Sequence, residues 1–213
     1  LEALKVRYQR GLKPQDLDWA MTQHRTFWKG FMKRGLKDFS WLLTSVKAEQ
    51  IEHLRGELKQ SNREWVRQSQ MTEEELQTHT LNQVLRVLED WLGPLDPKQV
   101  DQLRAWIRPD AEWVSVKLEN RRHYQKELVS LIQSHKAPEA LGDRLRDWID
   151  HPHTIRLPQY NTGLKEKQAE WKTLLLRIDR ISFARQKAHF AEKLQDLIDD
   201  FRDLTNERPW FKI

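Results

Sequence analysis

The sequence predicts an all-α fold, in which eight or nine helices form a bundle or array and chain neighbours pack antiparallel across short loops. Apolar residues recur at helical steps of three and four almost throughout, and no segment alternates long enough to be a strand. Only seven Gly and eight Pro interrupt the 213 residues. The composition is polar, with 32% charged residues, which suits amphipathic helices with narrow apolar stripes.

Proline and glycine residues set the expected boundaries of the helices. Pro14 is at a favoured first helical position, and Gly35 is expected to end the helix that follows. Pro152 and Pro158 lie in the longest expected loop, residues 150–161. The predicted helices lie near residues 14–35, 36–43, 47–65, 72–91, 96–107, 110–135, 138–149, 164–178 and 190–204.

Capping residues mark two helix starts most clearly. Thr72 and Glu75 form a predicted capping box, in which each side chain bonds the backbone amide of the other residue. In the segment EDWLGPLDPKQ, Gly93 is expected to end one helix, and Asp96 and Gln99 are expected to cap the next. Nothing in this corner requires a ligand.

The same corner has a weak internal repeat. VKAEQIEHLRGEL (46–58) resembles LDPKQVDQLRAWI (95–107), with Gln50 aligned on Gln99, and a fainter third copy lies at 181–190. Helix starts look alike because capping is chemically constrained, and an ancestral repeat would give the same likeness. Both interpretations stay open.

Residues 1–213 are expected to form a single helical domain, which is long enough to bury a core. The chain has no Cys, which excludes internal disulfides and thiolate metal sites. No apolar run approaches the roughly 18 residues of a transmembrane helix. Because residue 1 is Leu and not Met, the chain is expected to begin inside a longer precursor.

The net charge is +5, and the 37 basic and 32 acidic residues are interleaved along the chain. The densest basic cluster consists of Lys117, Arg121, Arg122 and Lys126 on one predicted helix. A cluster of this kind is usually a solvated helix face, and the alternative is a face that binds an anionic partner.

Most of the ten Trp fall on apolar stripes and are expected in the core. Trp210 and Phe211 differ, because they lie in a tail that is predicted to be irregular. This tail could dock on the domain or on a partner.

Residues suited to catalysis or metal binding form no motif. His151 and His153 are alternate residues of an expected loop, so their side chains should point apart. Asp196, Asp199 and Asp203 share a helix face that should be solvated. Neither a nucleophile motif nor a Gly-rich phosphate loop is present. We therefore expect no enzyme, no cofactor and no metal.

Five segments carry a family resemblance that spans nearly the whole chain: RVLEDWLGPLDPKQ (86–99), RPDAEW (108–113), ENRRHYQKEL (119–128), LPQYNTGL (157–164) and RQKAHFAEKLQDLIDDFRDL (185–204). Together they resemble an uncharacterised family of proteobacterial, chiefly gammaproteobacterial, lipoproteins with a Trp-Gly-x-Leu-[Ser/Thr/Asp]-Pro-x-Gln step between helices. The resemblance implies a signal peptide and a mature N-terminal region, both expected to lie outside this chain. It also implies a lipidated Cys and residence on the periplasmic side of the envelope, with the outer membrane as the expected membrane.

The resemblance and the missing catalytic motifs lead us to expect a non-enzymatic envelope lipoprotein that serves as a protein-interaction or structural module. Its expected partner is another envelope protein, and a lipid anchor outside this chain would attach it to the membrane. One alternative is a periplasmic chaperone-like module that binds apolar segments. Another is a binder of an anionic polymer or nucleic acid through the basic helix face, although nucleic acid is not expected for an envelope protein.

Overall fold

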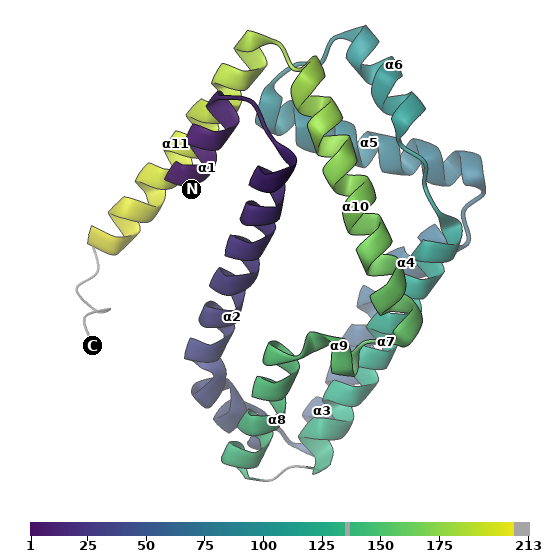
Figure 1. Ribbon diagram of the computed structural model, residues 1–213. Coiled ribbons are helices and arrows are strands. Elements are labelled where there is room, and N and C mark those ends of the chain that lie inside the picture. The colour runs from purple at the N-terminus through teal and green to yellow at the C-terminus, as the bar shows by residue number, and fades with distance from the viewer. Residues whose placement is uncertain (135–136, 207–213) are drawn as a thin grey trace. The chain divides into compact units, whose positions relative to one another are not determined.

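The computed structural model describes residues 1–134 and 137–206, and over these residues it confirms the all-α fold (Figure 1). The described residues form no strand. They form eleven helices, of which α9 is a single turn: α1 (Glu2–Gln9), α2 (Pro14–Thr44), α3 (Ala48–Ser61), α4 (Arg63–Ser69), α5 (Glu73–Leu92), α6 (Pro97–Trp106), α7 (Ala111–Ser134), α8 (Pro138–Asp150), α9 (Pro152–Ile155), α10 (Pro158–Ile181) and α11 (Ala184–Asn206). Antiparallel packing of chain neighbours stays a prediction.

Two predicted helices are in fact one. Helix α2 runs without a break from Pro14 to Thr44, so the expected end at Gly35 is wrong. Gly35 does not adopt the positive φ with which glycine ends a helix, a conformation that only Gly11 and Gly93 adopt among the described glycines. A glycine inside a helix lowers its stability by about 1 kcal/mol relative to Ala, but does not end it.

Prolines begin helices where a long loop was expected. Within residues 150–161, Pro152 begins α9 and Pro158 begins α10. Pro suits the first turn because its ring fixes φ near the helical value and because an N–H there has no intrahelical partner. The long loop is therefore wrong, and this is one reason why the structure has more helices than expected.

The predicted caps are confirmed. The Thr72 amide donates to Glu75 Oε2 at 2.8 Å, and the Glu75 amide donates to Thr72 Oγ1 at 3.3 Å. Gly93 follows α5 with φ of 75°. Asp96 begins α6 by accepting a hydrogen bond from the Lys98 amide at 2.8 Å.

Contacts divide the chain into two compact units, which are described separately here. Unit 1 comprises residues 1–21, 77–108 and 169–213, and unit 2 comprises residues 22–76 and 109–168. Helices α2, α5 and α10 belong partly to each unit. That the chain is a single domain stays a prediction.

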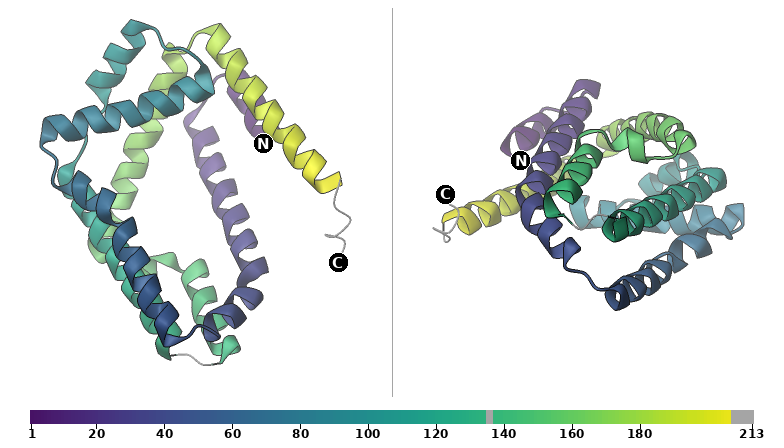
Figure 2. Two further views of the ribbon diagram at one scale, coloured as in Figure 1. Left: turned by 180° about the vertical axis from the view of Figure 1, so that it is seen from behind. Right: turned by 90° about the horizontal axis from the view of Figure 1, so that it is seen from below.

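In unit 1, α1 lies along α11, as Figures 1 and 2 both show. The core of this unit consists of Tyr8, Leu81, Leu92, Leu103, Ile107 and Ile178. The ring of Phe190 lies 4.1 Å from that of Tyr8 and 5.5 Å from that of Trp91, measured between centroids. Aromatic packing therefore fixes the corner at which α5 ends.

In unit 2, α3 and α4 lie along α7 (Figure 2). One cluster of buried residues joins α2, α7, α8 and α9: Leu36, Leu131, Leu141, Leu145, Trp148 and Ile155. A second cluster joins α3 to α7: Ile51, Val129 and Ile132. Because α7 contributes to both clusters, it is the central helix of this unit.

Candidate functional site

The predicted anionic-partner face on α7 is divided into two pairs, and the first pair faces other helices. Lys117 and Arg121 are both half-buried. The ammonium of Lys117 lies 5.1 Å from the centre of the Trp65 ring, and burial lowers the pKa of this lysine. Arg121 donates to Asn62 Oδ1 at 2.8 Å and to Ser61 Oγ at 3.2 Å. These two cations therefore hold α3 and α4 against α7.

The second pair, Arg122 and Lys126, is exposed. These residues are four positions apart and lie on one side of the helix, and neither makes an ion pair with a described residue. The predicted cluster of four cations thus leaves two side chains that face solvent, which is less charge than the sequence suggested for an anion-binding face.

The predicted docking tail, Trp210 and Phe211, lies outside the described residues. Of the Trp residues that were expected in the core, Trp148 is buried, whereas Trp28 and Trp41 are exposed. The expectation that most Trp pack in the core therefore fails on α2.

Two of the polar residues that the sequence singled out for chemistry, His151 and Asp199, are engaged in local pairs. His151 Nδ1 lies 3.0 Å from Asp147 Oδ1, and Asp199 pairs with Arg202 at 3.1 Å. Among the described residues, no group of three or more His, Asp or Glu side chains could hold a metal ion. No described helix is long and apolar enough to cross a membrane.

An open depression of about 650 Å³ lies beside the start of α3 in unit 2. Its lining residues are Val46, Ala48, Glu49, Ile51, Glu52 and Gln133. Glu49 and Glu52 are exposed and therefore solvated, so they do not form a polar centre that would orient a ligand.

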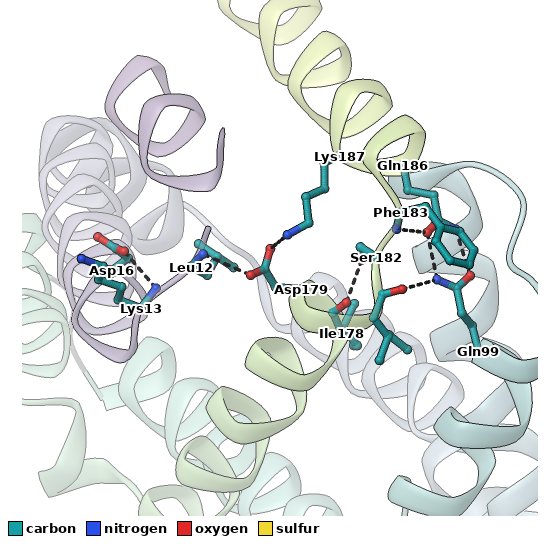
Figure 3. Close-up of polar contacts among 11 residues, drawn as sticks. Leu12, Lys13, Asp16, Gln99, Ile178, Asp179, Ser182, Phe183, Gln186 and Lys187 are labelled. Atoms are coloured by element: carbon teal, nitrogen blue, oxygen red, sulfur yellow. Dashed lines mark hydrogen bonds and ion pairs between the residues drawn. The ribbon is translucent and has the colours of Figure 1, made fainter. Parts of the chain in front are cut away.

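Unit 1 contains a buried carboxylate at the start of α2 (Figure 3). Asp16 is only 1% exposed. It accepts hydrogen bonds from Arg7 at 2.6 Å, Arg10 at 2.7 Å and the Lys13 amide at 3.0 Å. These bonds, that of Arg7 above all, hold the pKa of Asp16 below its ordinary value. The carboxylate is thus fully used in joining α1 to α2.

A second buried carboxylate joins α10 to two other segments (Figure 3). Asp179 accepts from the Leu12 amide at 3.2 Å and from Lys187 Nζ at 2.9 Å. The pKa of Tyr8 is raised to about 12, mainly because the phenol is buried and secondly because the negative charge of Asp179 is near. Since its partners come from the chain itself, Asp179 has a structural role.

Two buried glutamines connect the starts of α6 and α11 (Figure 3). Gln99 and Gln186 are 4% and 1% exposed. Gln99 Oε1 accepts a hydrogen bond from the Asp96 amide, and Gln186 Oε1 accepts one from the Phe183 amide, each at 2.9 Å. The two side chains also bond each other, at 2.9 and 3.0 Å from amide nitrogen to oxygen. The pair caps two helices and links them.

This pair has an approximate two-fold relation. The Gln99 amide also donates to the Ile181 carbonyl at 2.8 Å, and the Gln186 amide donates to the Pro94 carbonyl at 3.0 Å. The faint third copy at 181–190 thus repeats the capping geometry of the corner at Pro94. Gln50 caps α3 in the same way, with 2.9 Å to the Lys47 amide, but it is exposed. Shared ancestry and convergent capping both stay open.

Helix α2 is held on unit 2 by one side only. Leu36 and Ser40 are 5% and 2% exposed, and Leu36 packs in a cluster with leucines of α8. A Cβ on Gly142 of α8 would lie 3.0 Å from Ser40 Oγ, so the two helices approach closely. Lys33 pairs with Asp150 at 2.7 Å, and this hydrogen bond lowers the pKa of the carboxylate.

The rest of the surface of α2 is exposed and carries many large apolar side chains. It carries seven of the sixteen large apolar side chains that are exposed among the described residues, and we name these seven the α2 outer face: Phe27, Trp28, Phe31, Met32, Phe39, Trp41 and Leu42. The ring of Phe31 lies 5.7 Å from that of Trp28 and 6.4 Å from that of Phe27. Monomeric proteins rarely expose a continuous apolar patch without a use for it.

The same part of α2 also carries most of the net charge. Residues 22–44 contain five basic residues and one acid: Arg25, Lys29, Lys33, Arg34, Lys37 and Asp38. Their net charge is +4 of the chain's +5, and the other 190 residues hold 32 basic and 31 acidic side chains. Arg25, Arg34 and Lys37 are exposed and make no ion pair with a described residue.

Sequence reasoning missed this face. In the sequence, Leu17, Met21, Trp28 and Phe31 follow one another at helical steps, and such a stripe normally packs in the core. In the structure Leu17 is buried, but Trp28 and Phe31 are 52% and 59% exposed. The available signal was the charge of residues 22–44, because the interleaved charges of the whole chain conceal this local excess.

Comparison with known proteins gives a family. The model of a family of unknown function, DUF6279, matches residues 1–161, which include all of α2. No curated protein and no solved structure matches the chain. Since the match covers 161 of 213 residues, the chain belongs to this family of unknown function.

Proposed function

We propose that this protein is a non-enzymatic binding module whose working surface is the α2 outer face. One observation supports the proposal: seven large apolar side chains are exposed along α2, on the surface that remains outside its contact with α8. Exposed apolar patches with a polar rim are typical of binding sites. Burying these rings against a partner would remove apolar surface from water.

The proposed location rests on the sequence resemblance described above. We propose that the protein is a proteobacterial lipoprotein on the periplasmic side of the envelope, with its lipid anchor outside this chain. Its partner would then be another component of the envelope.

The test compares retention of envelope components by immobilised protein. The variant Phe31→Ser/Trp41→Ser changes the α2 outer face, where these side chains are 59% and 67% exposed. The matched control Phe201→Ser/Leu204→Ser changes two side chains of α11 that are each 54% exposed. We expect the first variant to lose roughly tenfold or more in retention, because apolar contact area is removed, and the control to lose little. If both variants retain envelope components equally well, the proposal is wrong.

The same face favours a second candidate, a chaperone-like module that binds unfolded apolar segments. In that case the protein should suppress client aggregation at a near-stoichiometric ratio, and the Phe31→Ser/Trp41→Ser variant should not. If several unfolded clients aggregate unchanged in its presence, this candidate is wrong.

A further inference from the structure

We infer that the α2 outer face docks on an anionic lipid surface, with α2 lying in the plane of the headgroups. The inference rests on the proposed function, because it names the partner of the same face. Helices with Trp, Phe and Leu on one side and Lys or Arg beside them are the kind that lie at a membrane interface. Three features of α2 support this partner.

The first feature is a row of large apolar side chains along α2, which the exposed Asp38 interrupts between Phe31 and Phe39. Phe27, Phe31, Phe39 and Leu42 follow one another at steps of four, eight and three, which place them on one side of the helix. From the first to the last, the row is about 22 Å long at 1.5 Å per residue. Leu36 is nine residues after Phe27 and five after Phe31, which places it on another side of the helix from these two rings, and there it packs in a cluster with residues of α7, α8 and α9.

The second feature is the placement of cations and Trp along the edges of this row. Arg34, Lys37 and Trp41 follow at steps of three and four along one edge, and Arg25 lies one turn before Trp28. Arg and Lys can lay their aliphatic stems on apolar surface while their charges reach the phosphates. Trp favours the same level, because its ring is apolar and its N–H requires a polar partner.

The third feature is charge, which argues against a second copy of the chain as partner. In a two-fold contact of this face with itself, Arg34 and Lys37 would approach the same cations of the other copy, and Asp38 is the only acid of the segment. Lys29 and Lys33 interact with Asp150 of α8, but the exposed Arg25, Arg34 and Lys37 still exceed Asp38 by two charges and attract an anionic surface.

The test uses residues 1–213. These contain no Cys, so a single introduced Cys gives one labelled site. Phe31→Cys carries an environment-sensitive fluorophore, and Leu204→Cys on α11 is the control site. With vesicles of equal parts phosphatidylcholine and phosphatidylglycerol, emission at position 31 should rise and shift to the blue, while position 204 changes little. Vesicles of phosphatidylcholine alone should bind more weakly, and added salt should weaken binding to the anionic vesicles.

A charge variant measures the electrostatic part. Arg34→Gln/Lys37→Gln should weaken binding to the anionic vesicles about 25-fold, since each cation near such a surface contributes roughly fivefold. Its circular dichroism should not change, because both side chains are exposed. Equal affinity for both kinds of vesicle would overturn the inference.

Other occupants of the face give different results. A label at position 31 that is buried without lipid, in a protein that sediments as a dimer, would identify a second copy and overturn the inference. If vesicles do not bind but envelope retention still depends on Phe31 and Trp41, the partner is a protein, and only the proposed function stands. If neither vesicle binding nor envelope retention depends on Phe31 and Trp41, the inference and the proposed function are both wrong.

Discussion

The α6–α11 junction of unit 1 and the α2 outer face of unit 2 depart from the usual distribution of side chains in opposite directions. The junction buries two amides, with Gln99 and Gln186 only 4% and 1% exposed. The α2 outer face exposes aromatic rings, with Phe31 and Trp41 59% and 67% exposed. Polar groups inside and apolar groups outside both raise the free energy of the folded chain unless something compensates.

The compensation differs between the two regions. Both glutamines use their amide nitrogen and oxygen in hydrogen bonds within unit 1, so folding alone accounts for their burial. The rings on α2 gain no comparable burial from the residues that the structure describes. The junction therefore serves the fold, and the contrast supports our proposal that the α2 outer face binds a partner.

The largest expected effect separates the two sides of α2. Leu36→Ala should lower the free energy of unfolding by about 2–5 kcal/mol, because a buried leucine leaves a cavity. Phe31→Ala should change it by no more than about 0.5 kcal/mol, because the ring is exposed. Urea unfolding of both variants measures the difference. A large loss in Phe31→Ala would show that the ring is covered in the folded chain, and the contrast with the junction would then disappear.

The next effect tests the junction against its exposed counterpart. Gln99→Ala should lower the free energy of unfolding by about 1–3 kcal/mol, because the amide of Gln186 and the Ile181 carbonyl would lose buried hydrogen bonds. Gln50 makes the same cap in solvent, so Gln50→Ala should cost less, about 0.5 kcal/mol. Similar losses for the two substitutions would mean that burial and pairing add nothing to the cap.

Local chemistry explains which parts of the fold were predictable. The caps at Thr72 and Asp96 were found because a helix start is decided by residues two or three positions apart. Gly35 and Pro158 were misjudged because each residue type has two uses. Gly can continue a helix that packing supports, and Pro can begin one, and the choice depends on contacts that lie far away in the sequence.

The candidate site was harder to predict, because exposure is a property of pairs of helices. Trp28 and Leu36 both lie on α2, yet only the second meets α8. On α7, Arg121 and Arg122 are neighbours in sequence, but the first reaches Asn62 about sixty residues earlier. An apolar stripe or a basic cluster therefore shows which residues could share a face, and not which face remains free.

The smallest effect tests the division of α7. Arg121→Met should lower the free energy of unfolding by about 1 kcal/mol, because Asn62 is only 7% exposed and would lose its shorter hydrogen bond to Oδ1. Arg122→Met removes a solvated charge and should stay within about 0.5 kcal/mol of the wild type. Thermal or urea unfolding of the two single variants suffices, since the substitutions remove the same charge from adjacent residues. If both are neutral, Arg121 is as free as Arg122, and the four cations of α7 would again form one candidate face that competes with α2 for an anionic partner.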